Sequence, residues 1–345
     1  MTGIVLGNNC RSFQSRRWID FYWDVAGDFP CAIWVYYLQH LVLRPRSCYS
    51  CVMKIVCCWL YAISKYGYPP TLPETFLAIE EMAAMGFRYA ELEGLWKQNN
   101  LRAMYRVRHE VRRRCNDLGV KVVNYCPILP DTVSLDARKR RQSWDEFEIG
   151  METALDLGCE LVQLDSFTPP LKFVGDAPYK KAIQFGQRIA VRVDAKFDWA
   201  RQWAAIVESV AHCARRAKSA GLKLIMEPRV GEMISNTDAM LRLMDHVGSD
   251  NFYAVLDTGH LYAQKELLPL SVEKLGRRIA YVHASDNDGR TNAHLALGEG
   301  TIDWPSLFAA LKKHRFDGYI GVDVGGVPQL TREYIRSRKF LDKIV

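Results

Sequence analysis

Short apolar runs alternate with segments of helical spacing along most of this chain, from Met53 to the C-terminus. Apolar runs bounded by turn residues are typical of buried strands. The predicted strands are residues 54–60, 88–93, 120–126, 160–165, 222–227, 252–257, 279–285 and 319–323. Strands that alternate with helices favour a parallel sheet, because a parallel neighbour can be reached only through a crossover connection. A closed (β/α)8 TIM barrel is the simplest architecture with this number of strands.

The segments between the strands carry helix signals. Apolar residues at helical spacing predict helices at 73–86, 104–119, 144–158, 203–221 and 304–318. Several of these end on glycine, which tolerates the left-handed conformation at a helix C-terminus. A doubly wound open sheet is the alternative architecture. It is less favoured, because eight units exceed its usual number and no G-x-G-x-x-G motif follows the first strand.

Residues 1–52 lie outside this alternation. They are rich in Trp and Tyr and keep no lasting period, so we expect an N-terminal extension, disordered or not native, before one barrel domain at 53–345. The apolar run 31–43 is too short and too polar for a bilayer span of ~20 residues, so no membrane partner is expected. It also begins too late for an ordinary signal peptide.

Cysteine and charge indicate the compartment and the class of partner. The ten cysteines form no disulfide framework of the kind found in short secreted domains, so reduced thiols and a cytoplasmic location are expected. The pair Cys48 and Cys51 has no second C-x-x-C partner, which disfavours a zinc site there. The net charge of +7 includes basic clusters at 108–114 and 137–142. We interpret them as a solvated helix face and a loop, and expect no nucleic-acid partner.

The last four predicted strands each end in a polar side chain, at Glu227, Asp257, His283 and Asp323. In a barrel these strand ends surround one mouth, where barrel chemistry takes place. Three carboxylates that converge there would repel one another without a cation. With one neutral imidazole they suit a divalent metal ion such as Mn, Mg, Co or Zn, the expected cofactor. A single acid at a strand end is often only the cap of the next helix, so the prediction of a metal site depends on all four residues together.

Five motifs follow in a fixed order: IMEP (225–228), VLDTGH (255–260), YVHASDNDGR (281–290), LGEGTIDW (297–304) and VDVGG (322–326). With them, residues 53–343 resemble the xylose isomerase-like TIM-barrel superfamily of sugar isomerases and epimerases. The resemblance implies the same four metal ligands, with His260 and Arg290 as substrate contacts. It implies Glu227 and Asp323 as the acid/base pair of a ketose 3-epimerase. The family acid on the eighth strand is usually Glu, and a ~1 Å displacement of a catalytic group can cost ~100-fold in rate.

These residues predict a divalent-metal-dependent isomerase or epimerase that moves a proton next to the polarised carbonyl of a sugar or related polyhydroxy ketone. A lyase or hydrolase that acts on oxidised sugars or inososes, such as an inosose dehydratase, would use the same metal site. The endonuclease IV branch is a less favoured alternative. It needs three zinc ions and histidines on the second and third strands, where this chain has Glu93 and Asn124. It also needs an Asp-x-His motif after the seventh strand, where this chain has Asn292 to His294, so only His294 matches that ligand set.

Further polar residues lie around the same predicted mouth. Glu232 and Arg229 follow the fifth strand closely and are either substrate contacts or surface charges. Glu93 and Asp165 end the second and fourth strands and either contact a sugar or anchor helix N-termini. Trp59 is either a pocket wall or part of the core.

Two long connections and the partners complete the prediction. Residues 127–142 and 166–198 exceed ordinary loop lengths and suggest a lid or a subunit contact. The expected partner is a small-molecule carbohydrate substrate. The resemblance also implies a homo-oligomer that pairs through barrel loops.

Overall fold

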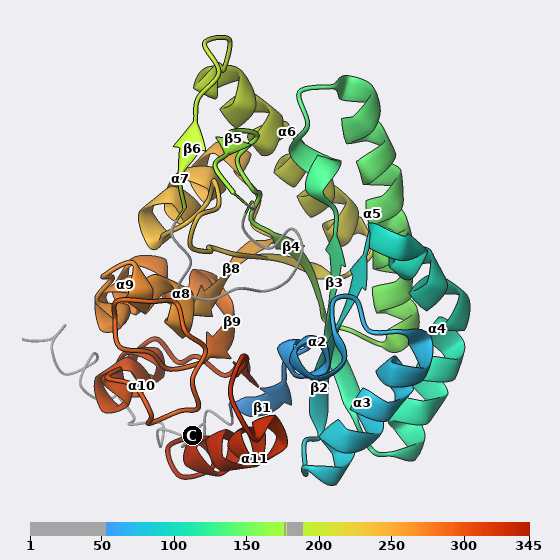
Figure 1. Ribbon diagram of the computed structural model, residues 1–345, viewed down its shortest axis with the longest axis vertical. Coiled ribbons are helices and arrows are strands. Elements are labelled where there is room, and N and C mark those ends of the chain that lie inside the picture. Colours follow the sequence, from blue (N-terminus) through green and yellow to red (C-terminus); the bar gives the residue numbers. More distant parts are fainter. Residues whose placement is uncertain (1–52, 176, 178–188) are drawn as a thin grey trace, which may run out of the picture. The chain divides into compact units, whose positions relative to one another are not determined.

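The computed structural model describes residues 53–175, 177 and 189–345 (Figure 1). Their parallel strands form a closed barrel in the order β1-β10-β9-β8-β7-β4-β3-β2, which confirms the predicted (β/α)8 architecture. The barrel strands are β1 (Lys54–Cys57), β2 (Tyr89–Leu95), β3 (Lys121–Ile128), β4 (Leu161–Asp165), β7 (Lys223–Glu227), β8 (Phe252–Asp257), β9 (Ile279–Ala284) and β10 (Tyr319–Val322). The predictions for residues 1–52, including the Cys48 and Cys51 pair, lie outside the described residues.

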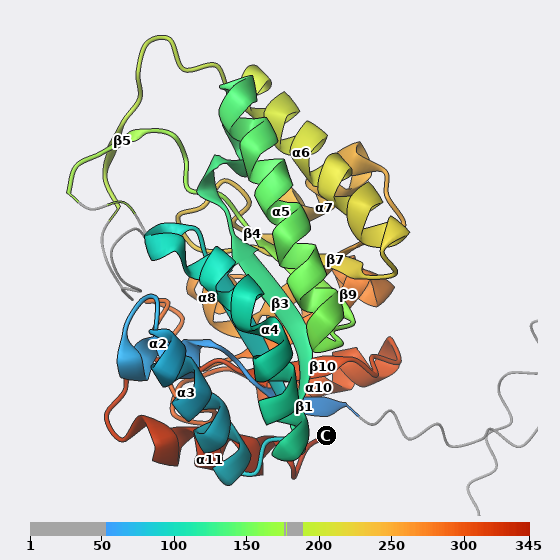
Figure 2. The same cartoon turned by 90° about the vertical axis from the view of Figure 1, so that its right-hand side faces the viewer.

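Helices cover the outside of the barrel. They are α2 (Leu60–Tyr66), α3 (Leu72–Ala84), α4 (Asn100–Asp117), α5 (Ala137–Leu157), α6 (Trp199–Ser219), α7 (Thr237–Val247), α8 (Thr258–Ala263), α9 (Leu268–Leu275), α10 (Trp304–Lys313) and α11 (Leu330–Leu341). Figure 2 shows α4 and α5 side by side in front of β3, and both helices contact that strand. Their apolar faces therefore complete the layer of core outside the barrel wall.

Residues along each strand alternate between two apolar layers. On β8, Leu256 belongs to the outer core that strands share with helices, whereas Val255 lies in the core inside the barrel. The inner core also holds Ile225 of β7 and Tyr281 of β9. Each of these three inner residues is followed two positions later by a polar residue at the strand end. The strand period therefore turns those polar side chains towards the barrel axis.

The predicted long connection at 127–142 and the predicted basic loop at 137–142 are both wrong. β3 continues to Ile128, a 3-10 turn covers Pro130–Val133, and α5 begins at Ala137. The side chain of Asp136 accepts a hydrogen bond from the backbone N–H of Arg138 at 2.8 Å and caps α5. The first turns of α5 are charged and show no apolar period, so the apolar pattern could not predict where this helix begins. The N-cap residue Asp136 was the available signal for its start.

The connection at 166–198 contains two short strands, β5 (Lys172–Phe173) and β6 (Val191–Arg192), which pair antiparallel. Residues 176 and 178–188 of this connection lie outside the described residues. The six cysteines of the described part are free and buried. No described helix combines the length and the apolar character that crossing a membrane requires.

Candidate active site

Three of the predicted metal ligands meet at the C-terminal ends of β7, β8 and β9. The Nδ1 atom of His283 lies 2.7 Å from Oε1 of Glu227 and 3.8 Å from Oδ2 of Asp257. One ligand atom from each of the three residues lies within 4.8 Å of the other two. All three residues are buried, and Asp257 is 0% exposed. Neighbouring strands thus bring two carboxylates and an imidazole into one enclosed space.

The two carboxylate oxygens of Asp257 have different surroundings. Oδ1 accepts a hydrogen bond from the backbone N–H of His260 at 2.6 Å and so caps helix α8. Oδ2 is buried and has no hydrogen-bond partner among the described residues. Burial, followed by the nearby charge of Glu227, raises the pKa of Asp257 well above its usual value. Asp257 can therefore cap a helix and bind a metal ion at the same time, because each role uses a different oxygen.

His283 and the carboxylates around it form a set of ligand atoms that suits a divalent cation. Burial opposes a positive charge on this imidazole, but Cys58, Glu91 and Glu227 outweigh it and raise the pKa of His283 well above its usual value. Burial likewise opposes the charge on Glu227, and His283 outweighs it and lowers the pKa of Glu227. A buried carboxylate oxygen without a donor, at Asp257, is costly unless a cation compensates it. Carboxylates with one imidazole suit Mn, Mg, Co or Zn.

Asp323, the fourth predicted ligand, reaches the same pocket but contacts a different residue. Its Oδ2 atom lies 2.9 Å from Nδ1 of His294 as an ion pair, and the same Nδ1 hydrogen-bonds to the backbone carbonyl of Asp323 at 2.9 Å. Its ligand atoms group with Cys58 and His283, and not with Glu227. Burial opposes a charge on His294, but the hydrogen bond to Asp323 outweighs it and raises the pKa of His294 to about 9. The structure therefore joins Asp323 to the pocket and leaves it outside the three-residue cluster.

Glu91 of β2 is a site residue that the sequence analysis missed. Its Oε2 atom lies 3.1 Å from Nε2 of His283 and accepts a hydrogen bond from Nδ2 of Asn124 at 3.1 Å. Its Oε1 atom accepts a hydrogen bond from the backbone N–H of Trp59 at 3.3 Å, and the Trp59 side chain itself lies in the core. A carboxylate on the second ring nitrogen fixes the orientation of a histidine. The strand period could have indicated Glu91, because a residue two positions before Glu93 lies on the same face of β2.

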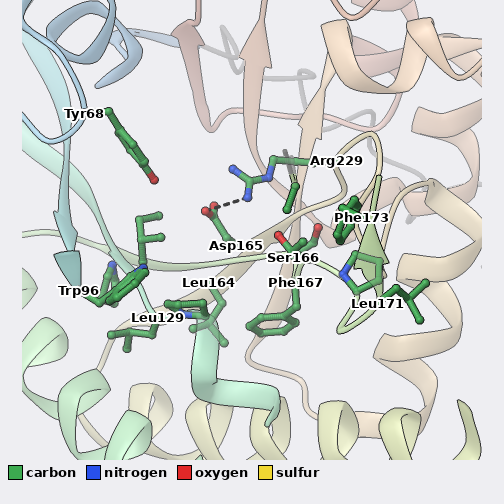
Figure 3. Close-up of a pocket in the computed structure, with 16 residues that line it drawn as sticks. Tyr68, Trp96, Leu129, Leu164, Asp165, Ser166, Phe167, Leu171, Phe173 and Arg229 are labelled. Carbon is green, nitrogen blue, oxygen red and sulfur yellow. Dashed lines mark ion pairs between the residues drawn. The ribbon is translucent and has the colours of Figure 1, made fainter. Parts of the chain in front are cut away.

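Two predicted substrate contacts, Asp165 and Glu232, both interact with Arg229. Nη2 of Arg229 lies 3.0 Å from Oδ2 of Asp165 (Figure 3) and 3.9 Å from Oε1 of Glu232. The hydroxyl of Thr168 also donates a hydrogen bond to Oε1 of Glu232 at 2.9 Å. Glu232 is 6% exposed, which excludes the surface alternative for this residue.

One pocket gathers most of the predicted site residues. Its lining includes Glu93, Asp165, Glu227, His260, His283, His294 and Asp323. Nδ1 of His260 faces the backbone N–H of Val230 at 3.4 Å. Arg290 does not line this pocket: it is exposed, and its backbone N–H donates to Asp288 in a turn. The arginine that lines the pocket is Arg229, whose neighbouring acids hold it there.

Glu232 should make the stability of the protein depend on pH. Burial, opposed by Arg229, raises the pKa of Glu232 from 4.5 to about 7. Between these values the folded chain holds a proton that the unfolded chain has lost, so the free energy of unfolding falls as pH rises, by about 3 kcal/mol in all. Glu232→Gln should remove this part of the slope. Urea unfolding at pH 5 and pH 8 measures it, and a slope unchanged in the variant contradicts the assignment.

Comparisons with known proteins show what this chain is similar to. Residues 79–344 match the family model described as Xylose isomerase-like TIM barrel. Among curated proteins, the chain is similar to the inosose dehydratase of Clostridium perfringens, with 26% identity over 161 residues, 41% of this chain and 54% of that enzyme. It is similar to the fructoselysine 3-epimerase of Escherichia coli O157:H7, with 25% identity over 125 residues, 35% of this chain and 46% of that enzyme. The chain spans about half the length of these two relatives.

A longer match and the solved structures extend the comparison. The inosose dehydratase of Geobacillus kaustophilus is 23% identical over 291 residues, 77% of this chain and 86% of that enzyme. An L-ribulose 3-epimerase has a TM-score of 0.63 and 19% identity, covering 85% of this chain and 94% of its own. The IOLI protein with a zinc atom has a TM-score of 0.63 and 18% identity, covering 85% and 98%. At these identities the similarity of structures shows the barrel fold.

Proposed function

Because this chain belongs to the xylose isomerase-like TIM-barrel family, we propose that it is a metal-dependent isomerase or epimerase of a sugar or related polyhydroxy ketone. The observation that carries the proposal is the meeting of Glu227, Asp257 and His283, with one buried oxygen of Asp257 left without a hydrogen-bond donor. The similarity to sugar epimerases and inosose dehydratases supports the same class of substrate.

One divalent ion would be held by Glu227, Asp257 and His283, with Asp323 as the fourth ligand. A bound cation polarises a substrate carbonyl and acidifies the neighbouring C–H group. Carboxylates suit Mn and Mg, whereas an imidazole is a poor ligand for Mg, so we propose manganese within the range of Mn, Mg, Co and Zn.

Glu227 and Asp323 would act as the acid/base pair. They come from β7 and the end of β10, which are not neighbours in the barrel, and both line the pocket. One carboxylate would take a proton from one face of the substrate carbon, and the other would return a proton to the opposite face. His294 would orient Asp323 through their ion pair of 2.9 Å.

The remaining polar residues of the pocket would position the substrate. We propose His260, Glu93 and Asp165, which line the pocket, as contacts to substrate hydroxyls. Glu232 is proposed as a further contact, because it lies beside Arg229 of that lining. Carboxylates that already share an arginine present their remaining lone pairs in fixed directions, which favours recognition of hydroxyl groups. Arg290 would contribute only from the rim of the barrel, because its side chain is exposed.

Glu91→Gln should weaken metal binding without removing a ligand. The amide keeps the size of the side chain but no longer supplies the charge that orients His283 through its Nε2 atom. Loss of such an outer partner typically costs about 10-fold to 100-fold in metal affinity. Titration calorimetry with Mn²⁺ measures this, with Glu80→Gln on the exposed face of α3 as the matched control. Equal affinities in wild type and Glu91→Gln would remove Glu91 from the site.

Deuterium incorporation tests the proposed function. The metal-loaded protein would be incubated with ketoses, 3-keto sugars and inososes in deuterated water and followed by NMR. Deuterium at one substrate carbon identifies the carbon that exchanges its proton. No exchange and no product across the panel would contradict an isomerase or epimerase. Metal content near one ion per chain supports the sugar enzyme, and near three supports the endonuclease alternative.

An inosose dehydratase is the second candidate, favoured by the similarity to enzymes of that name over as much as 77% of this chain. The same carboxylate would remove a proton next to a carbonyl, and a hydroxyl group on the adjacent carbon would then leave as water. Loss of water from an inosose in the same NMR experiment distinguishes this reaction, because an epimerase returns the proton and keeps every hydroxyl.

Location and assembly follow from the same proposal. The free thiols of the described cysteines support a cytoplasmic location, and the family supports a homo-oligomer. Light scattering on the purified protein tests the second point directly.

A further inference from the structure

A second pocket opens beside the metal-ligand pocket and has apolar walls. Its volume is about 320 Å³, which is within the range of small-molecule sites. Figure 3 shows Tyr68 and Trp96 on one side of it and Leu171 and Phe173 on the other. Phe167 also lines it and is buried. The size and the aromatic lining suit a flat apolar group.

The two pockets share part of their lining. Asp165 and Arg229 line both of them and are joined by the ion pair of 3.0 Å. Figure 3 shows this pair between the aromatic residues of the second pocket. A ligand bound over Glu227 could therefore extend past the ion pair into the apolar pocket without leaving the protein surface.

The chemistry of the walls decides what kind of group could enter. Asp165 and Arg229 are the charged residues of this lining, and they neutralise each other. An ammonium group would find no further acid there. The hydroxyls of Tyr68, Ser166 and Thr168 also line the pocket, but carbon makes up most of its wall, and sugar hydroxyls set against that carbon would lose water without gaining partners. Trp96 is 48% exposed at the pocket, and a large aromatic side chain in that position offers a face for stacking.

We propose that the substrate is a sugar derivative carrying an apolar aromatic substituent, with the sugar over the metal-ligand pocket and the aromatic ring in the pocket of Trp96 and Phe173. This inference rests on the proposed function and narrows it from free monosaccharides to aryl-substituted ones. The aromatic pocket selects the substrate, and the carboxylates at the strand ends act on its sugar.

Matched probes test the substituent. Phenyl β-D-glucoside and methyl β-D-glucoside, each oxidised to the ketone at C3, would be titrated calorimetrically into the manganese-loaded protein. Burial of the ring should make the phenyl compound bind about 10-fold to 100-fold more tightly than the methyl compound. Equal affinities, or failure of both compounds to bind, would overturn the inference.

Two tryptophan variants test whether the phenyl ring binds in this pocket. Trp96→Ala should bring the ratio of phenyl to methyl affinity down towards one, because it removes one wall of the pocket. Trp199→Ala is the control, since Trp199 is similarly exposed, at 40%, at the start of α6, outside the pocket lining. Unchanged ratios in both variants would place the ring elsewhere and overturn the assignment.

Deuterium exchange separates this inference from the proposed function. Exchange with both compounds at equal affinity would keep the sugar chemistry and reject the aromatic pocket. A strong phenyl preference without exchange in either compound would keep the pocket and reject the proton transfer.

Discussion

Glu227→Gln is expected to slow deuterium incorporation into the substrate by about 100-fold to 10,000-fold, the range that a positioned acid or base contributes. Glutamine keeps the length of the side chain and can still hydrogen-bond to Nδ1 of His283, which lies 2.7 Å from Oε1 in the wild type. It cannot accept a proton from carbon, and it offers less charge to a cation. The rate is measured by NMR on whichever panel compound exchanges, at saturating metal.

The control for this variant is Glu160→Gln. Glu160 precedes β4 at the opposite end of the barrel from the strand-end acids and is exposed, where it pairs with Lys121 at 2.5 Å. This control should exchange at the wild-type rate, because exposed ion pairs contribute little to stability. If Glu227→Gln exchanges as fast as Glu160→Gln, Glu227 is not the acid or base.

Asp257→Asn is expected to abolish the stabilisation of the protein by divalent metal. In the wild type, a ligand that binds the folded chain at 1,000 times its dissociation constant adds about 4 kcal/mol to the free energy of unfolding. Asparagine can retain the cap on His260 through Oδ1, so the apo variant should be at least as stable as the apo wild type. It also removes the buried carboxylate whose pKa is raised by burial and by Glu227.

Asp303→Asn is the matched control for this prediction. Asp303 also caps a helix, α10, by accepting a hydrogen bond from the backbone N–H of Ser306 at 3.1 Å, and it lies outside the site. Thermal unfolding with and without Mn²⁺ compares the three proteins, and elemental analysis counts the bound ions. A full metal-induced stabilisation in Asp257→Asn would show that this carboxylate holds no ion.

Local sequence patterns were enough for the barrel but not for its connections. The apolar runs predicted every barrel strand, because a strand buried on both faces must be apolar along its length. The basic start of α5 gave no such signal, since its first turns face solvent and its cap, Asp136, is a single residue. The connection at 127–142 was therefore predicted as long, although the structure leaves little of it irregular.

The candidate site divides in the same way. Glu227, Asp257 and His283 could be predicted because each ends an apolar strand, and parallel strands bring their ends to one mouth. Glu91 could not be ranked above Glu93 from the sequence, because both are glutamates on one strand and both line the pocket; only the contact of Glu91 with His283 separates them. Arg229 and Arg290 both follow strand ends, and only the turn at Asp288 shows that Arg290 points outward.

By itself the sequence determined the barrel and the polar residues at its strand ends, because periodicity and order along the chain are local properties. Only the tertiary structure decided which oxygen of Asp257 caps a helix and which lacks a donor, and that Asp323 pairs with His294. It alone placed an aromatic pocket beside the acids. Contacts and cavities depend on the register and packing of strands far apart in the chain, and no local pattern encodes them.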